Sequence, residues 1–333
     1  MFARLERDWR HLAGARLFIT GGTGFIGRWM LEALTQANQR LGLAVEAVIL
    51  TRDPDMFARK VPHLAADPAI TLMQGDVLGF PSPDGAFSHV IHAATDASAA
   101  LTEHDPRRMF DTIVTGTRHT LDIAVDQRAQ YFFLSSGAVY GNQPWDVTHV
   151  GEDWLGGPDP CNPRNAYAEG KRAAEMLCGI YSKQFTLNVV TARIFALLGP
   201  LLSLDIHFAA GNFIRDAMAG HTIRVEGAGT AVRSYLYIAD LTVWLWTILL
   251  RGAPGAVYNC GSEEAISIAE LAERTARLLH GPGVEILGKP DPGWNPGRYV
   301  PSCGRIRRNL GVDAEVGLEE AIIRTAQSNG WNR

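Results

Sequence analysis

The chain has 333 residues, 47% of them hydrophobic and 20% charged, and its formal net charge is −4. This composition is typical of a globular protein with one large domain and a smaller one. The charge argues against nucleic acid as a partner, because no basic cluster supplies the positive face that phosphate binding needs.

Neither a membrane nor a metal ion is expected as a partner. Residues 1–10 alternate charged and apolar side chains and lack the apolar core of a signal peptide. The longest apolar run, 243–250, is too short to cross a bilayer and predicts a buried helix. The four cysteines are scattered and no metal-ligand spacing occurs, so we expect no metal site, no disulfide and a cytoplasmic location.

The first part of the chain alternates short apolar segments with longer segments of helical spacing. The apolar segments predict six strands, at 16–19, 45–50, 70–74, 89–92, 131–134 and 187–192. Helices are predicted at 25–40, 104–128 and 166–185. Such alternation predicts a parallel sheet covered on both faces, with ligands bound at the carboxyl ends of the strands.

After Phe195 the elements become shorter and more mixed. Strands are predicted at 222–225 and 234–237, and helices at 239–250, 268–280 and 315–327. The change in pattern predicts a second, smaller domain.

A glycine-rich turn joins the first predicted strand to the first predicted helix. Its sequence is Thr20-Gly21-Gly22-Thr23-Gly24-Phe25-Ile26-Gly27. Glycines in this position let the backbone turn sharply and approach a pyrophosphate, and the amide groups at the helix start point toward that anion. The turn therefore predicts a dinucleotide site, with a purely structural turn as the alternative.

Tyr167 and Lys171 are one helical turn apart on the predicted helix 166–185. A neighbouring ammonium is expected to lower the tyrosine pKa from its ordinary value of about 10. Such a tyrosine can exchange a proton with a sugar oxygen while a hydride moves to or from nicotinamide. Ser136, which follows the fifth strand, can bind the same oxygen. The alternative is a surface tyrosine stacked on the lysine stem.

Taken together, the motifs resemble those of the extended short-chain dehydrogenase/reductases. Within that group the chain is similar to the NAD-dependent epimerase/dehydratase family, which acts on nucleotide sugars. The matching motifs, in order, are Thr20–Gly27, Gly75-Asp76-Val77, His92-Ala93-Ala94, Ser135–Gly141, Tyr167 with Lys171, and Arg233–Leu241.

The resemblance implies an α/β fold, with a Rossmann-type doubly wound parallel sheet and a smaller α/β C-terminal substrate domain. The NAD(P)-binding domain would span 1–195, with 239–262 returning to it, and 196–333 would be mainly substrate-binding. The family also implies a homodimer, paired through a four-helix bundle built from the helices at 104–128 and 166–185.

Roles for single residues follow from the same resemblance. The catalytic set would be Ser136, Tyr167 and Lys171. Besides Tyr167 and Lys171, the implied cofactor contacts are Gly21, Thr23, Gly24, Phe25, Ile26, Gly27, Asp76, Val77, Ala93, Ala94 and Thr95. The nucleotide-sugar substrate would meet Ser136, Asn212, Arg233 and Arg298, although surface or interdomain salt bridges are the alternative for the last three.

The two residues that directly follow Ser136 differ between the enzymes of this family that catalyse different reactions. Family members that are 4,6-dehydratases carry Asp and Glu there, and sugar-acid decarboxylases keep the Glu. This chain has Gly137 and Ala138, neither of which can transfer a proton. Dehydration and decarboxylation are therefore disfavoured. Reduction of a keto sugar remains, as does epimerisation by oxidation and re-reduction.

The end of the second strand favours NADP over NAD. Relatives that prefer NAD carry there an acid that binds both ribose hydroxyls. This chain has Thr51 and Arg52, and Arg28 follows the glycine turn. Two guanidinium groups suit a 2′-phosphate, although Asp53 could bind the ribose if the register shifts by two.

A preference for NADP favours a net reductase, with Tyr167 as the proton donor. The leading hypothesis is a reductase of a nucleotide-linked 4-keto-6-deoxy sugar. A dTDP-linked sugar is favoured because residues 197–214 are similar to such reductases in deoxysugar pathways. An NAD-dependent nucleotide-sugar 4-epimerase is the first alternative. A non-catalytic nucleotide-sensing protein is the second.

Overall fold

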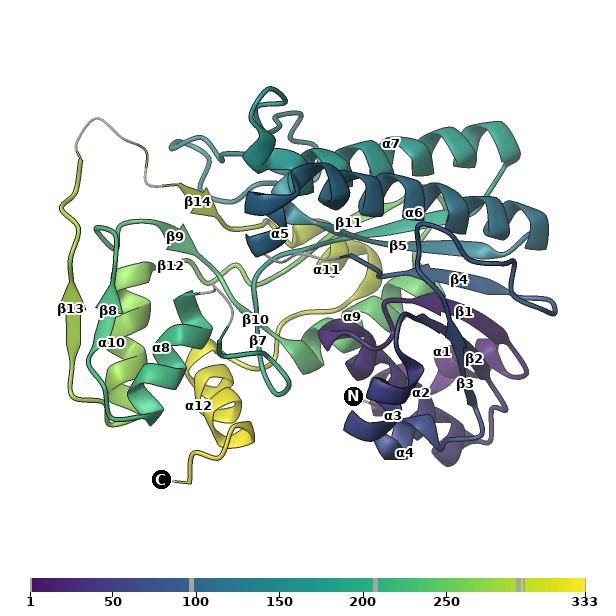
Figure 1. Ribbon diagram of the computed structural model, residues 1–333, viewed down its shortest axis with the longest axis horizontal. Coiled ribbons are helices and arrows are strands. Elements are labelled where there is room, and N and C mark those ends of the chain that lie inside the picture. The colour runs from purple at the N-terminus through teal and green to yellow at the C-terminus, as the bar shows by residue number, and fades with distance from the viewer. Residues whose placement is uncertain (1, 96–98, 206–208, 292–294, 296, 333) are drawn as a thin grey trace. The chain divides into compact units, whose positions relative to one another are not determined.

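The computed structural model describes residues 2–95, 99–205, 209–291, 295 and 297–332 (Figure 1). Residues 206–208, part of the 197–214 stretch noted above, lie outside them. The chain forms two compact units, each assembled from separate segments. Unit 1 consists of Met1–Val139, Pro158–Arg193 and Thr242–Tyr258, and unit 2 of Tyr140–Gly157, Ile194–Leu241 and Asn259–Arg333.

Unit 1 is built on a seven-stranded sheet in the order β11-β6-β5-β4-β1-β2-β3. The pairs β3 with β2, β2 with β1, β1 with β4 and β4 with β5 are parallel. The strands are β1 Arg16–Thr20, β2 Glu46–Thr51, β3 Ile70–Gln74, β4 His89–His92, β5 Gln130–Ser136, β6 Val189–Ile194 and β11 Val257–Cys260. This order is that of a doubly wound dinucleotide-binding sheet, so the predicted fold class is confirmed.

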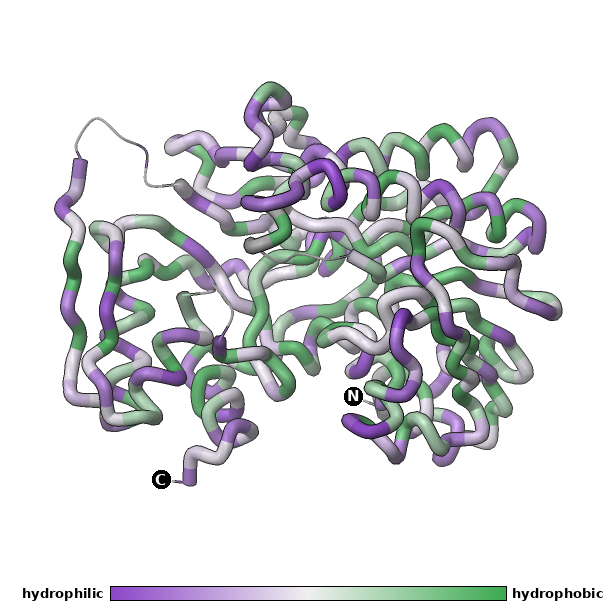
Figure 2. Tube along the Cα trace, viewed as in Figure 1, coloured by the Kyte–Doolittle hydropathy of each residue, from purple (hydrophilic) through white to green (hydrophobic). Residues whose placement is uncertain are grey.

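Helices cover both faces of this sheet, as Figure 1 shows for α6 and α7 on one side and α2 and α9 on the other. Their bounds are α1 Phe2–Trp9, α2 Phe25–Leu41, α3 Pro54–Lys60, α4 Pro62–Ala65, α5 Ala99–His104, α6 Pro106–Gln127, α7 Ala166–Phe185 and α9 Ile238–Arg251. In Figure 2 hydrophobic and hydrophilic residues alternate along α6 and α7, as expected for helices that bury one face.

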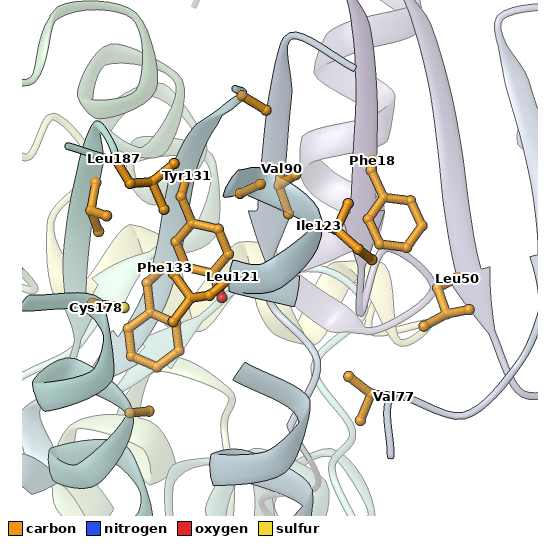
Figure 3. Close-up of a cluster of buried hydrophobic side chains, with 14 of the residues drawn as sticks. Phe18, Leu50, Val77, Val90, Leu121, Ile123, Tyr131, Phe133, Cys178 and Leu187 are labelled. Atoms are coloured by element: carbon orange, nitrogen blue, oxygen red, sulfur yellow. The ribbon is translucent and has the colours of Figure 1, made fainter. Parts of the chain in front are cut away.

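The core of unit 1 follows the two-residue alternation of its strands. Phe18, Val90 and Phe133 point toward α6 and α7, where they join Leu121 and Cys178 in one buried cluster (Figure 3). On the other side, Trp9 of α1 and Trp246 of α9 are fully buried, and their ring centroids are 4.5 Å apart. The apolar run 243–250 is therefore a buried helix, as predicted.

Unit 2 consists of shorter elements in small sheets. They are β7 Leu197–Leu198, α8 Ala209–Met218, β8 Ile223–Val225, β9 Val232–Arg233, β10 Leu236–Tyr237, β12 Ile266–Ser267, α10 Ile268–Leu278, β13 Val284–Ile286, β14 Arg298–Tyr299, α11 Gly304–Leu310 and α12 Leu318–Ser328. The single strand predicted at 234–237 was wrong. Two short strands flank Ser234 and Tyr235, because β9 pairs with β12 and β14 whereas β10 pairs with β7.

In the part of the chain that the structure describes, no helix is both long and apolar enough to cross a membrane. Across those same residues, no group of three or more His, Cys, Asp and Glu side chains is arranged to hold a metal ion.

Candidate functional site

The glycine turn follows β1 and opens α2, with Gly24 as the N-cap residue. Gly21 has a φ of +72°, and a Cβ there would lie 2.5 Å from the Ala93 carbonyl carbon. A Cβ on Gly27 would lie 2.5 Å from the Gly22 Cα. Gly21 and Gly27 are therefore required by the packing of the turn itself.

Gly24 differs from these two glycines, because the protein around it leaves room for a side chain. Its φ is −79°, it is exposed, and a Cβ would meet only the Gly21 carbonyl oxygen, at 3.3 Å. No side chain caps the start of α2. The open position and the uncapped amide groups fit the close approach of a pyrophosphate. Thr23, Phe25 and Ile26 are half-buried beside it.

The sheet brings the other strand ends to the same edge. Thr20 is in register with His92, and the amide groups of Ala93 and Ala94 bond to the Thr20 carbonyl and hydroxyl oxygens at 3.1 and 3.2 Å. Thr95 Oγ1 is buried and has no hydrogen-bond partner among the described residues. An orphaned polar atom at this edge fits a ligand that would satisfy it.

Asp76 and Val77 follow β3 and have different surroundings. The Asp76 carboxylate accepts the Leu78 amide at 2.9 Å and so forms a turn. The Val77 side chain is buried and would touch any Cβ placed on Gly116 of α6. Val77 therefore presents its backbone, rather than its side chain, to the strand edge.

The residues after β2 bear on the choice of dinucleotide. Thr51 is buried and Arg52 is exposed. Asp53 is the N-cap of α3, and its Oδ1 accepts the Met56 amide at 2.8 Å. Arg28 is half-buried, burial lowers its pKa, and its Nε has no hydrogen-bond partner among the described residues. The cap contact ties Asp53 to α3, whereas Arg28 retains an unsatisfied donor.

Ser136 and Tyr167 are joined by a side-chain hydrogen bond. Ser136 ends β5 and is only 6% exposed. Its Oγ accepts the Ala138 amide at 3.1 Å, which leaves its hydroxyl hydrogen to donate. Tyr167 lies in the first turn of α7 and packs against the buried cluster. The structure thus brings together the proposed proton donor and its hydroxyl partner.

Lys171 lies one turn farther along α7 and is 2% exposed. Its Nζ donates to the Leu134 carbonyl at 2.8 Å and lies 4.9 Å from the centre of the Phe133 ring. Burial lowers its pKa to about 8, against an opposing effect of Glu175 and a smaller one of Cys178. Lys171 therefore titrates near physiological pH.

The predicted lowering of the Tyr167 pKa was wrong. Burial raises it, the bond with Ser136 opposes that rise, and Lys171 is not among the causes. The reason is that Lys171 directs its ammonium to the Leu134 carbonyl of β5. Tyr167 is thus held as a neutral phenol, the form that donates a proton.

A polar cluster that was not predicted from the sequence lies beside this set. Glu175 accepts the Ser135 hydroxyl at 2.6 Å and forms a two-pronged ion pair with Arg193 of β6. The spacing of Glu175, four residues after Lys171, was the available signal. A second missed pair is Thr20 and His92, whose Oγ1 and Nδ1 are 2.7 Å apart. Burial and Lys171 lower the His92 pKa to about 3, so this histidine is neutral.

Apart from Ser136, which belongs to unit 1, the predicted substrate residues lie in unit 2. Arg233 of β9 donates to the Gly297 carbonyl at 3.2 Å. Arg298 of β14 pairs with Val232, and its buried Nε has no hydrogen-bond partner among the described residues. Asn212 of α8 accepts from Arg215 at 3.4 Å. Arg233 and Arg298 thus lie on neighbouring strands, and Asn212 lies on a separate helix.

Comparison with known protein families gives one match that spans most of the chain. Residues 17–261 match the family described as "NAD dependent epimerase/dehydratase family". UDP-glucuronic acid decarboxylase 6 of Arabidopsis thaliana is 29% identical over 309 residues, which cover 92% of this chain and 86% of that protein. UDP-glucuronic acid decarboxylase 1 of Xenopus tropicalis is 30% identical over 312 residues, 93% of this chain and 71% of that protein.

Solved structures of similar fold extend the comparison. A dTDP-glucose 4,6-dehydratase from Streptomyces venezuelae, the DesIV double mutant with NAD and DAU bound, matches with a TM-score of 0.80 and 23% identity, covering 96% of this chain and 98% of that one. A UDP-glucuronic acid 4-epimerase from Bacillus cereus, in complex with UDP-glucuronic acid and NAD, has a TM-score of 0.79 and 21% identity, with coverage of 94% and 98%.

Proposed function

The chain belongs to the NAD dependent epimerase/dehydratase family, and from that premise we propose that it reduces a nucleotide-linked 4-keto-6-deoxy sugar. The family match confirms the resemblance found in the sequence and, with it, an enzyme of the extended short-chain dehydrogenase/reductase type. One observation supports the finer proposal: Ser136 bonds to Tyr167, with Lys171 one turn along the same helix, whereas Gly137 and Ala138 supply no carboxylate.

The geometry supports proton donation to a substrate oxygen. Ser136 would bind the carbonyl oxygen of the keto sugar through its hydroxyl hydrogen. Tyr167, held as a neutral phenol, would then give its proton to that oxygen. The Lys171 ammonium, which donates to the Leu134 carbonyl in this structure, would turn toward the phenolate left behind and stabilise it. A bound nicotinamide cofactor would supply the hydride. Water elimination or decarboxylation would need an acidic side chain at 137 or 138, where this chain has Gly137 and Ala138.

We propose NADP as the preferred cofactor. The capping role of Asp53 and the unsatisfied Nε of Arg28 support this choice. With Arg52, two guanidinium groups would meet the extra phosphate of the ribose. The solved relatives were determined with NAD, so NAD remains the cofactor of the alternative reaction.

We further propose that Asn212, Arg233 and Arg298 bind the sugar nucleotide, with the two arginines on its diphosphate. The half-buried guanidinium groups of β9 and β14 support this assignment. A homodimer is also proposed. The exposed apolar side chains Met176 and Ile180 are one turn apart on α7, and Phe185 lies at its end, where a partner helix could cover them.

The test is a direct assay of purified protein. It is incubated with dTDP-4-keto-6-deoxyglucose and NADPH or NADH, while cofactor absorbance and sugar products are followed. The expected result is stoichiometric oxidation of NADPH with conversion of the 4-keto group to a 4-hydroxyl group, which gives a dTDP-linked 6-deoxyhexose. If NADPH stays reduced and the keto sugar is recovered unchanged, the reductase proposal is rejected.

A second candidate is an NAD-dependent 4-epimerase of a nucleotide sugar, favoured by the NAD-bound 4-epimerase structure of the same fold. In the same assay format, UDP-glucose or UDP-glucuronic acid replaces the keto sugar. Isomerised product without net cofactor consumption would identify the epimerase. Release of carbon dioxide from UDP-glucuronic acid would instead identify a decarboxylase, the activity for which the relatives from Arabidopsis thaliana and Xenopus tropicalis are named.

A further inference from the structure

Glu175, in unit 1, bonds to Ser135 and Arg193 and acts electrostatically on Lys171. Its Oε1 accepts the Ser135 hydroxyl at 2.6 Å, on the strand end next to Ser136. Its two oxygens accept from the Arg193 guanidinium, with Nη2 to Oε2 at 2.6 Å and Nε to Oε1 at 3.0 Å. On its own helix it is one turn from Lys171 and acts on that ammonium electrostatically.

Burial makes these contacts energetically important. The side chains of Arg193 and Glu175 are only 15% and 14% exposed, and Ser135 is 4% exposed. Charge-assisted hydrogen bonds in such surroundings are stronger than those at a surface, and removing one partner leaves a buried charge. Ser135 is thereby held in one orientation, and the peptide that joins it to Ser136 is held with it.

Two other ionisable side chains that interact with Lys171, those of Cys178 and His92, are neutral. Burial raises the Cys178 pKa above its ordinary value, and Figure 3 shows this thiol beside Phe133. His92 of β4 is neutral because burial depresses its pKa. The strand β5 presents the Phe133 ring and the Leu134 carbonyl to the ammonium. The buried face of α6 carries no ionisable side chain; its residues are Met109, Ile113, Gly116, Thr117, Thr120, Leu121, Ile123 and Ala124.

We propose that Glu175 is the positioning residue of the catalytic set: it fixes the Ser135–Ser136 strand end and keeps a negative charge beside the Lys171 ammonium. Arg193 partly neutralises the negative charge of Glu175, because its guanidinium binds the same carboxylate. This inference rests on the proposed function only in that the ammonium must be present for Tyr167 to act. The arrangement of Glu175, Arg193 and Lys171 can be tested without turnover.

Substitutions of Glu175 and Arg193 are expected to shift the Lys171 titration midpoint in opposite directions. Glu175→Gln keeps an acceptor for Ser135 but leaves the Arg193 charge uncompensated, which disfavours a second cation at Lys171. Arg193→Gln leaves the Glu175 carboxylate unshared, which favours that cation. We expect Glu175→Gln to lower the Lys171 titration midpoint by about one pH unit and Arg193→Gln to raise it by a similar amount. The double variant should return close to the wild-type midpoint.

The experiment is an NMR titration of protein labelled with ¹³C at lysine Cε. The chain has only four lysines, Lys60, Lys171, Lys183 and Lys289, and a Lys171→Arg sample assigns the signal. Glu169→Gln is the matched control, because Glu169 lies on the same helix but pairs with Arg172 at 3.6 Å. The alkaline limb of kcat for each variant is then measured and should move with its Lys171 midpoint.

Circular dichroism and thermal melting confirm that each variant is folded. Opposite displacements for Glu175→Gln and Arg193→Gln, with Glu169→Gln unchanged, would establish the positioning role. Midpoints equal to the wild type, or displaced in the same direction, would overturn it, as a purely structural ion pair predicts no opposite shifts. If the midpoints move as expected while no substrate turns over, the positioning role stands and the proposed reductase function fails.

Discussion

The candidate residues of unit 1 and those of unit 2 are held in different ways. Ser136 and Lys171 are almost completely buried. Ser136 accepts the Ala138 amide, and Lys171 donates to the Leu134 carbonyl. Arg233 and Arg298 are half-buried and lie on strands of only two residues each. Unit 1 therefore supplies a fixed frame for the proton transfer that we propose, whereas unit 2 presents its candidate side chains on short elements.

This difference predicts different kinetic consequences in the two units. Substitutions in unit 1 should reduce kcat or nucleotide binding, because they remove groups whose geometry is fixed. Substitutions in unit 2 should mainly raise the KM for the nucleotide sugar. A unit 2 arginine whose loss lowers kcat as strongly as a loss in the catalytic set would break the comparison.

The largest effect is expected for Tyr167→Phe. Removing the hydroxyl that bonds Ser136 removes the proposed acid, so kcat should fall by about a thousandfold. Tyr181→Phe on the same helix is the control, because its hydroxyl donates to the Asp122 carboxylate on the protein exterior. Steady-state oxidation of NADPH gives the measurement. A Tyr167→Phe enzyme within threefold of wild type would remove Tyr167 from the mechanism.

Next comes Gly24→Ala, which should weaken nucleotide binding about a hundredfold while the fold is kept. Its Cβ would project into the open approach to the α2 N-terminus rather than into the protein. The melting temperature without nucleotide should drop by no more than a few degrees. Titration by tryptophan fluorescence gives the dissociation constant.

Gly27→Ala is the matched comparison for that variant. Its Cβ would be forced against Gly22 Cα at 2.5 Å, so it should lower the melting temperature itself, by more than about 5 °C. If both glycine variants melted alike and bound nucleotide alike, Gly24 would have no special part in the cofactor site.

An intermediate effect is expected for Arg298→Gln in unit 2. Loss of a charge-assisted bond to the diphosphate should raise the substrate KM about thirtyfold and leave kcat within threefold. Arg224→Gln serves as control, since Arg224 forms an exposed pair with Glu285 at 3.3 Å. A normal KM for Arg298→Gln would show that its buried Nε serves the fold rather than the substrate.

The smallest effect is expected for Arg52→Gln. The exposed guanidinium should contribute only part of the 2′-phosphate contact, so kcat/KM for NADPH should fall about tenfold while that for NADH stays unchanged. Arg59→Gln, in the last turn of α3, is the control. Equal losses with both cofactors would count against the assignment of NADP.

Activity should also fall as the pH rises through about 8. Lys171 carries its proton below that pKa and loses it above, so the stabilisation that we propose for the Tyr167 phenolate should disappear on the alkaline side. The pH profile of kcat gives the measurement. In Glu175→Gln the fall should begin at a lower pH, for the reason given above. A flat profile between pH 7 and 9 would contradict this role of Lys171.

Local sequence patterns were sufficient to predict most strands of the sheet in unit 1 and two of its helices. Strand and helix periodicity predicted β1 to β6, α2 and α7, because one buried face leaves a regular mark on the sequence. The edge strand β11 was missed, since four residues after Gly255 carry too little pattern. Asp53 was left open as a ribose ligand, because only the folded loop shows its carboxylate capping α3.

By itself, the sequence determined the family, the parallel sheet and the pairing of Tyr167 with Lys171 on one helix, because short motifs and local periodicities predict each of them. The tertiary structure decided what those residues experience. Burial raised the Tyr167 pKa and lowered that of Lys171. Folding also brought Ser135 to Glu175 across 40 residues. Desolvation and long-range pairing depend on packing, and no local pattern encodes them.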